Sequence, residues 1–247
     1  MSVNCVICGE INLVPIRKRM DSTEVYDSLG ECLDCGCVLN TKSLSKCGTA
    51  EEINQKGSDF YIKDKFDFDT YTKSLESFSN LLSNITNPQS GYTKYDHFVD
   101  FGCGTGALGM CALSHYKKVS FVDHDLRGMN FILENWSGDL TFNEIQKINI
   151  HDSIDKIEGQ VDMVAMWHVL EHICNPLEVL SEIKDKLSDS GGICAQVPGF
   201  KDEYVEDVHY VFYNPDSLKK LFTKAGFREV KYAWDRENHF YTAFALK

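Results

Sequence analysis

Strand-like and helix-like segments alternate through the second part of this 247-residue chain, and this alternation restricts the fold more than any other feature. From residue 95 to residue 247, short apolar runs are followed by segments with helical periodicity. The run Val161–Trp167 is apolar at nearly every position, as expected for a strand buried on both faces. The alternation predicts a doubly wound, mostly parallel sheet with helices on both faces. The last two apolar runs have no helix between them, so we expect seven strands that end in an antiparallel hairpin.

The same patterns give approximate bounds for each element. Strands are predicted at residues 97–101, 119–123, 145–150, 161–167, 193–197, 227–234 and 240–246. Helices are predicted at residues 107–115, 126–135, 177–187 and 217–225. Gly191 and Gly192 are predicted to stop the third of these helices.

Two further regions precede the α/β domain predicted at residues 95–247. Residues 1–48 hold six of the ten cysteines and are predicted to form a small module like a zinc ribbon. Residues 49–94 are predicted to be a linker with a connecting helix that ends before Pro88. The helix is indicated by apolar residues at helical spacing, namely Leu75, Phe78, Leu81, Leu82 and Ile85.

Two Cys-x-x-Cys pairs, Cys5 with Cys8 and Cys32 with Cys35, predict a metal site in the N-terminal module. Four thiolates can surround Zn²⁺ tetrahedrally and leave no open position, so the ion would be structural. A module of this size buries too little apolar surface to fold without such an ion. Cys37 is a spare candidate ligand, whereas Cys47 is not expected to be one.

Composition restricts the partners and the compartment. The formal net charge of −12 argues against binding to long nucleic acids, which requires a basic face. No apolar run approaches the roughly 18 residues of a membrane-spanning helix, and the N-terminus lacks the pattern of a signal peptide. We therefore expect a cytoplasmic protein, in which reduced cysteines favour metal binding over disulfides.

A glycine-rich turn follows the first strand of the α/β region and precedes a helix. The turn contains Gly102, Gly104 and Gly106, and Asp100 comes just before it. In open α/β sheets, ligands bind beyond the carboxyl ends of the strands, close to such turns. Asp123 ends the next strand about 20 residues later, where a carboxylate can bind ribose hydroxyls. These residues alone do not decide between NAD and S-adenosylmethionine.

The wider sequence context resembles class I S-adenosylmethionine-dependent methyltransferases, a Rossmann-like family. The string VDFGCGTG at residues 99–106 resembles their first motif. Residues 121–125, 161–199 and 209–227 resemble the later motifs, in the order that the family has them. A dehydrogenase would also need a substrate domain, for which little chain is left. The resemblance therefore implies S-adenosylmethionine, and not NAD, as the cofactor.

Roles for single residues follow from this resemblance. It implies that the glycine turn packs against the amino-acid part of the cofactor and that Asp123 accepts hydrogen bonds from the ribose hydroxyls. Asp152 is placed to accept from the adenine amine, or else is an ordinary surface aspartate. Asp100 orients the turn or holds the cofactor's ammonium group through water. Trp167 and His168, at the end of the fourth strand, would border the methyl donor.

A proton acceptor is needed only if the methyl acceptor must lose a proton, and histidine suits that task. His209, in the loop after the fifth strand, is the first candidate base, with His168 and Glu171 as weaker candidates. We expect Tyr204, Tyr210 and Tyr213 to line an acceptor site.

His168 to His172 also fit the H-x-x-E-H pattern of inverted zinc proteases. That chemistry needs both histidines on one face of a helix. Here they follow a buried strand and precede Pro176, so we expect a structural or substrate-lining role in preference to metal binding. Metal binding stays the alternative, since some relatives in the family that the sequence resembles hold a metal with Glu and His residues near this position.

A zinc module ahead of a methyltransferase domain resembles the arrangement in sugar C-methyltransferases. That family places a histidine about nine residues before a leucine, as His209 and Leu218 stand here. Its Tyr-x-Glu-His pattern reads Glu206-Asp207-Val208-His209 in this chain, and its further C-terminal domain is not expected. The resemblance implies a small-molecule acceptor such as a nucleotide-linked sugar, with C-, O- and N-methylation all open. The alternatives are a methyltransferase acting on RNA or protein, or a non-catalytic cofactor-binding module.

Overall fold

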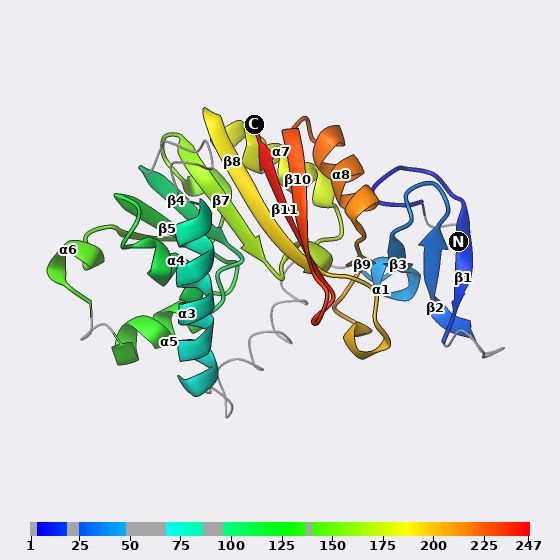
Figure 1. Cartoon of the computed structure of the whole chain (residues 1–247), viewed down its shortest axis with the longest axis horizontal. Coiled ribbons are helices and arrows are strands. Elements are labelled where there is room, and N and C mark those ends of the chain that lie inside the picture. Colours follow the sequence, from blue (N-terminus) through cyan, green and yellow to red (C-terminus); the bar gives the residue numbers. More distant parts are fainter. Residues whose placement is uncertain (1–3, 19–24, 48–67, 86–95, 137–139) are drawn as a thin grey trace. The chain divides into compact units, whose positions relative to one another are not determined.

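The computed structural model describes residues 4–18, 25–47, 68–85, 96–136 and 140–247 (Figure 1). The chain forms two compact units. One consists of residues 1–48, 167–185 and 193–247, and the other of residues 49–166 and 186–192. The N-terminal module thus belongs to the same unit as the end of the chain, and the three-part division predicted from the sequence stays a prediction.

A seven-stranded sheet confirms the predicted fold class. Its strands follow the order β10-β11-β8-β7-β4-β5-β6. Their bounds are β4 His97–Phe101, β5 Lys118–Val122, β6 Ile148–His151, β7 Val161–Trp167, β8 Leu187–Pro198, β10 Arg228–Asp235 and β11 Phe240–Leu246. Strand β4 pairs in parallel with β5 and β7, and β5 pairs in parallel with β6. The closing strands β10 and β11, coloured orange and red, are antiparallel, as predicted (Figure 1).

The chain direction makes β4 the point where the order of the parallel strands reverses. From β4 the chain runs outward to β5 and β6, and then returns to β7 on the other side of β4. Ligands of open α/β sheets bind at such switch points, beyond the carboxyl ends of the strands. The topology therefore selects the turn after Phe101 as the place to look for a cofactor site.

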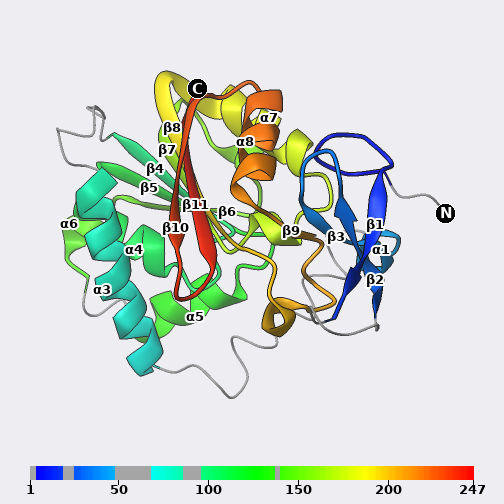
Figure 2. The ribbon, with the colours of Figure 1, turned by 45° about the vertical axis from the view of Figure 1, so that its right-hand side comes forward.

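The helices of the second unit cover its central strands. Helix α4 (Ala107–Ala112) follows β4, and α5 (Arg127–Trp136) follows β5. The predicted connecting helix is α3 (Phe68–Ile85), which lies beside α4 (Figure 2). Its apolar side chains Leu75 and Phe78 pack against buried Ala107 and Ile132. The rest of the predicted linker, residues 49–67 and 86–94 with Pro88, lies outside the described residues.

Two sequence predictions were wrong in detail. The third strand, predicted from residue 145, begins at Ile148, because Ile145 is the last residue of a short helix, α6 (Phe142–Ile145). Thr141 caps this helix in a reciprocal capping box with Glu144, a local signal stronger than the apolar pattern. Gly191 and Gly192 lie within β8, because α7 (Pro176–Lys186) ends before them. A Cβ on Gly191 would lie 3.0 Å from the Val161 carbonyl oxygen, so glycine permits close approach of the backbones.

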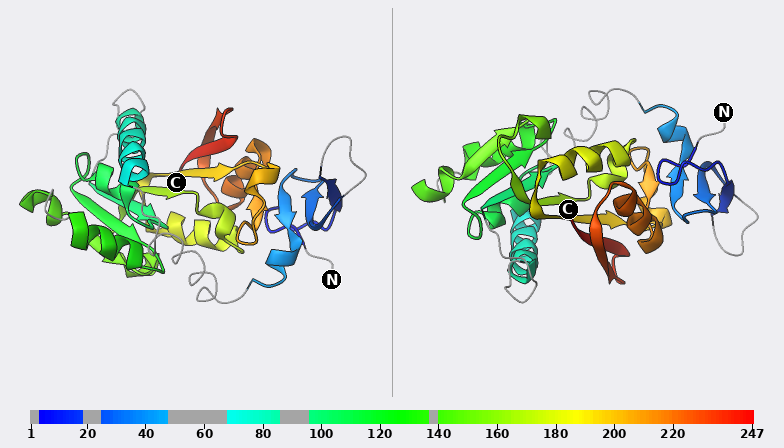
Figure 3. Two further views of the ribbon diagram at one scale, coloured as in Figure 1. Left: turned by 90° about the horizontal axis from the view of Figure 1, so that it is seen from below. Right: turned by 90° about the horizontal axis from the view of Figure 1, so that it is seen from above.

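The N-terminal module forms a second sheet that includes a strand from far along the chain. Its order is β1 (Leu13–Arg17), β2 (Val25–Cys32), β3 (Val38–Asn40) and β9 (Val211–Phe212). Strands β3 and β9 are antiparallel, with Val38 opposite Phe212. In Figure 3 the blue strands of the module lie beside the yellow-orange segment that precedes α8. Leu29, Val38 and Phe212 share one buried cluster. The module is therefore joined to the chain segment between β8 and helix α8 (Pro215–Lys224).

Polar and covalent links reinforce this join. The short helix α1 (Thr41–Leu44) is capped by Asn40, whose backbone amide donates to the Tyr210 carbonyl at 2.9 Å. The Asn214 side chain, which caps α8, also donates to the Gly36 carbonyl at 2.8 Å. Cys47 and Cys174 form a disulfide. Among the described helices, none combines the length and apolar character needed to cross a membrane.

Candidate functional site

The glycine turn between β4 and α4 exposes its backbone at one position and is packed at another. Gly104 and Gly106 have positive φ angles of 52° and 77°, which L side chains rarely adopt. A Cβ on Gly106 would lie 2.6 Å from the Met129 sulfur, so this glycine is needed for packing. At Gly104 nothing lies within 4 Å of such a Cβ, and a ligand can approach the main chain there.

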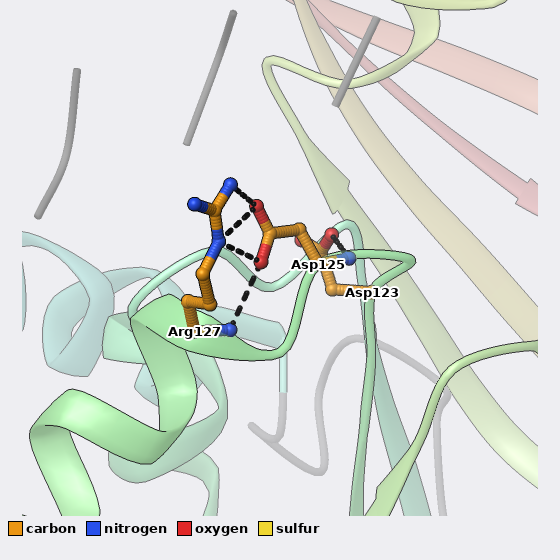
Figure 4. Close-up of polar contacts among 3 residues, drawn as sticks. All are labelled: Asp123, Asp125 and Arg127. Carbon is orange, nitrogen blue, oxygen red and sulfur yellow. Dashed lines mark hydrogen bonds and ion pairs between the residues drawn. The ribbon is translucent and has the colours of Figure 1, made fainter. Parts of the chain in front are cut away.

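Asp123, just after β5, fixes the position of this turn. One of its carboxylate oxygens accepts a hydrogen bond from the Gly104 amide at 2.8 Å, and the other accepts from the Asp125 amide at 2.9 Å. Asp125 in turn forms an ion pair with Arg127 at 2.7 Å, at the start of α5 (Figure 4). Burial raises the pKa of Asp123. The loops after two adjacent parallel strands are thus joined by one carboxylate.

Asp100 lies beneath the turn and supports it. It is buried, and its carboxylate accepts a hydrogen bond from the Gly109 amide within α4 at 2.8 Å. Burial raises the pKa of this carboxyl to about 7, and the charge of Asp123 contributes in the same direction. Of the two roles predicted for Asp100, this hydrogen bond matches the one of orienting the turn.

The other two predicted cofactor residues lie at strand ends. Asp152 follows β6 and is half-exposed, with Lys156 at 2.6 Å from its carboxylate. A hydrogen bond from Lys156 lowers the pKa of Asp152. Trp167 is the last residue of β7. Contact with a cofactor stays a prediction for both residues.

Four cysteines of the N-terminal module converge as the two Cys-x-x-Cys pairs predict. The sulfurs of Cys5, Cys8, Cys32 and Cys35 all lie within 4.8 Å of one another. Each pair forms a tight turn, because the Gly9 amide donates to the Cys5 carbonyl and the Gly36 amide donates to the Cys32 carbonyl. Hydrogen bonds from Cys35 and then from Cys37 lower the pKa of Cys5. The geometry and the donor set fit a tetrahedral zinc ion.

Cys37 lies beside this cluster. Its sulfur is 3.4 Å from that of Cys35 and 3.5 Å from that of Cys5. It is fully buried and comes from the start of the segment that leads into β3. The spare ligand named from the sequence is therefore within reach of the same ion.

The catalytic candidates gather within the first unit. Glu171 lies in a single turn of 3-10 helix (Leu170–His172) after β7, and His209 precedes β9. The Tyr210 amide donates to the Glu171 carbonyl at 2.8 Å, which ties these two segments together. His168 has a positive φ of 55° and its Nδ1 is 3.4 Å from the Glu171 carboxylate. His172 joins the group, with its ring centroid 4.7 Å from that of His209.

Two of the three tyrosines predicted to line an acceptor site lie in the protein interior instead. Tyr210 and Tyr213 are buried, and the Tyr213 hydroxyl donates to the Leu170 carbonyl at 3.3 Å. They therefore belong to the protein interior, a role that their position in a loop did not reveal. Tyr204 is partly exposed, and its ring stacks on that of Phe240 at 5.7 Å. The sequence singles out His172 only as part of the H-x-x-E-H pattern and does not predict its place beside His209.

The open sheet, its glycine turn at the switch point and the carboxylate after the next strand define a class I methyltransferase fold. The chain belongs to a methyltransferase family: the family model described as "Methyltransferase domain" matches residues 10–232.

Solved structures show the same fold at low sequence identity. Magnesium protoporphyrin IX methyltransferase from Synechocystis PCC 6803, with bound SAH, aligns with a TM-score of 0.56 and 13% identity, covering 81% of this chain and 95% of that one. An S-adenosylmethionine-dependent methyltransferase from Clostridium acetobutylicum ATCC 824 aligns with a TM-score of 0.52 and 12% identity, covering 80% and 99%.

Other matching structures are longer proteins. The CurJ carbon methyltransferase aligns with a TM-score of 0.56 and 14% identity, and the match covers 78% of this chain but only 58% of that one. The chain likewise spans 55% of an O-methyltransferase structure from Nostoc punctiforme PCC 73102. Among curated proteins, none matches this chain in sequence.

Proposed function

We propose that this protein binds S-adenosylmethionine at the turn between β4 and α4 and transfers its methyl group to an acceptor. The observation that carries the proposal is the bond between the Asp123 carboxylate and the Gly104 amide. It places an acceptor of hydrogen bonds beside an open stretch of backbone, at the switch point of a parallel sheet. Asp123 would accept from the ribose hydroxyls, while Gly102, Gly104 and Gly106 contact the amino-acid part of the cofactor.

The remaining cofactor contacts complete this proposal. Asp152 would accept from the adenine amine after release from Lys156, a half-exposed ion pair that costs little to break. Trp167 would border the methyl donor. Asp100 acts from below, through its bond to α4, and keeps the turn in place.

The acceptor that we propose is a small molecule, such as a nucleotide-linked sugar. The net charge of −12 disfavours a long polyanion such as RNA. The spacing of His209 and Leu218 is similar to that in sugar C-methyltransferases. Among the structural relatives, one carries a small-molecule substrate, magnesium protoporphyrin IX, in its own name.

His209 is the proposed group that activates or orients the acceptor. Its Nδ1 lies 2.6 Å from the Tyr204 carbonyl, which can only accept, so Nδ1 carries the proton. The other ring nitrogen, Nε2, therefore keeps its lone pair. Burial, and then the neighbouring His172, lower the pKa of His209, which favours the neutral ring. His168 and Glu171 are the next candidates.

We further propose that Cys5, Cys8, Cys32 and Cys35 hold one structural zinc ion. A closed set of four thiolates leaves no position for a substrate. The ion would stabilise the two cysteine turns, the second of which joins β2 to β3. Because β9 pairs with β3, the ion would also stabilise the loop that precedes β9.

A screen for acceptor-dependent formation of S-adenosylhomocysteine tests the proposed function. Nucleotide sugars, other small metabolites, RNA and protein are offered as separate groups. Turnover with a small molecule alone supports the proposal. Turnover only with RNA or protein would replace the acceptor class, and cofactor binding without any turnover would favour a non-catalytic module.

A further inference from the structure

A second group of metal-ligating side chains lies apart from the cysteines. Single ligand atoms of Glu171, His172 and His209 all lie within 4.8 Å of one another. Atoms that share one ion at roughly 2.1 Å lie within about 4 Å of each other, so only a small contraction is required. The three residues come from the turn after β7 and from the loop before β9, which are joined through the Tyr210 amide.

Glu171 is a buried carboxylate with no hydrogen-bond donor among the described residues. It is 0% exposed, and neither of its side-chain oxygens accepts a hydrogen bond from the described residues. The nearest basic atoms are His168 Nδ1 at 3.4 Å and His172 Nε2 at 4.0 Å, both beyond good hydrogen-bond distance. A buried carboxylate costs several kcal/mol unless it is paired or binds a metal. A cation bound between Glu171, His172 and His209 would pair this buried carboxylate.

In both histidines, Nδ1 is bound to a backbone carbonyl, so the other ring nitrogen, Nε2, is the one that can bind such a partner. His172 Nδ1 is 2.9 Å from the Val208 carbonyl, and His209 Nδ1 is 2.6 Å from the Tyr204 carbonyl. A carbonyl only accepts, so both Nδ1 atoms carry protons, and in each neutral ring Nε2 is the nitrogen with a lone pair. This is the arrangement of metal-bound histidines, whose second nitrogen donates to a backbone carbonyl and fixes the ring.

We propose that Glu171, His172 and His209 bind a divalent transition-metal ion such as Zn²⁺, Fe²⁺, Mn²⁺ or Co²⁺. Two imidazoles and one carboxylate suit these ions and leave coordination positions open for oxygen ligands, in contrast to the closed set of four thiolates. His168, which has a strained positive φ, lies next to this group, with its Nδ1 3.4 Å from the Glu171 carboxylate. The sequence pattern H-x-x-E-H thus contributes Glu171 and His172, and His209 supplies the ligand that the pattern lacks.

A bound ion would change what His209 does during methyl transfer. This step of the inference rests on the proposed function. A histidine bound through Nε2 cannot take a proton from the acceptor. It would instead hold an ion that binds an acceptor oxygen and makes its hydroxyl more acidic. Metal binding itself does not depend on methyl transfer, so the two proposals can fail separately.

The test counts metal ions on the full chain, without any activity measurement. Wild-type protein is first loaded with one equivalent of Zn²⁺, which the four thiolates take up, then titrated with Co²⁺, and both metals are measured after removal of free ions. We expect one cobalt per chain, with visible d–d absorption but without the strong thiolate charge-transfer band in the near ultraviolet. Glu171→Gln and His209→Gln should each weaken cobalt binding by at least roughly 10- to 100-fold. His115→Gln, which changes a histidine of the other unit, should bind as the wild type does.

Circular dichroism and retained zinc content show whether each variant folds, and His172→Gln replaces any variant that does not. Absence of cobalt binding in the wild type would overturn the proposal, as would equal binding by the variants. A thiolate charge-transfer band would place the cobalt on the cysteines and would overturn it as well.

Discussion

The Asp123 carboxylate and the Gly104 amide, 2.8 Å apart, join the end of β5 to the turn after β4. The two loops come from adjacent parallel strands, and each would be less well defined without the other. Because Asp123 also accepts from the Asp125 amide, its carboxylate organises the whole edge of the proposed cofactor site. This makes Asp123 the most informative position for a test of cofactor binding.

We expect wild-type protein to bind S-adenosylmethionine and S-adenosylhomocysteine and not NAD, as measured by calorimetry. Asp123→Ala should weaken cofactor binding by about 1–3 kcal/mol, because hydrogen-bonding groups lose their partner. Asp96→Ala is the control, since it removes an exposed ion pair with Lys117 at the start of β4. Unchanged affinity of Asp123→Ala would exclude Asp123 from the site, and binding of NAD alone would exclude the proposed cofactor.

The cysteine cluster should contain one zinc ion when the protein is purified without chelators. Cys32→Ser should lose this ion and destabilise the β1-β2-β3-β9 sheet, because Cys32 lies at the end of β2. Cys111→Ser should keep it, since the Cys111 thiol donates to the Leu75 carbonyl in the other unit. Elemental analysis and thermal unfolding measure both effects. Zinc-free protein, or disulfides among the four cysteines, would argue against the site.

His209→Ala should reduce kcat by about 10²–10⁴-fold with the true acceptor, whether His209 acts as a general base or holds the proposed ion. Affinity for S-adenosylmethionine should stay nearly the same, since the proposed cofactor contacts lie elsewhere. Steady-state kinetics and calorimetry on the same preparation separate the two. Loss of both would indicate a role in folding or cofactor binding. A wild-type rate would make His209 a bystander and shift attention to His168 and Glu171.

Buried His97 should make the fold sensitive to acid. Its Nε2 is 2.8 Å from the Ser120 hydroxyl, and burial, aided by the charge of Lys118, lowers its pKa to about 4. The unfolded chain, with a histidine pKa of about 6.5, then binds the proton first. The stability that depends on neutral His97 is therefore present above about pH 6.5 and is lost as the pH falls towards 4.

Urea unfolding of the wild type and of His97→Asn, at about pH 7.5 and about pH 5, measures this contribution. The free energy of unfolding should fall by about 2 kcal/mol more in the wild type than in the variant. His124→Asn, at an exposed position, should behave as the wild type does. Identical pH dependence of wild type and His97→Asn would show that His97 is not held neutral by the fold.

Most of the α/β sheet could be predicted from the sequence because its central strands have strong local signals. The strand β4 is exactly the apolar run before Gly102, and β7 is exactly the apolar run 161–167. The errors came where two local signals compete. At residue 145 the capping box of α6 outweighed an apolar pattern, and at Gly191 the close approach to β7 outweighed the helix-stopping tendency of glycine.

The cysteine cluster and the glycine turn could be predicted because each is encoded in a short motif. The cluster around Glu171 could not, since His209 meets it only through the tertiary structure. The disulfide between Cys47 and Cys174 has the same origin, as its partners are 127 residues apart. No periodicity or spacing in the chain links such distant residues, and their proximity depends on packing of the whole unit.

The pairing of β3 with β9 also sets an order of events during synthesis of the chain. All the sulfurs of the cysteine cluster are available once Cys37 has left the ribosome, so an ion can be captured at that stage. The sheet that this ion supports cannot be completed until Val211 and Phe212 have emerged, after almost the entire parallel sheet has been made. The nascent module must therefore persist with the β3 edge of its sheet unpaired until late in synthesis, and such an edge can pair with other chains.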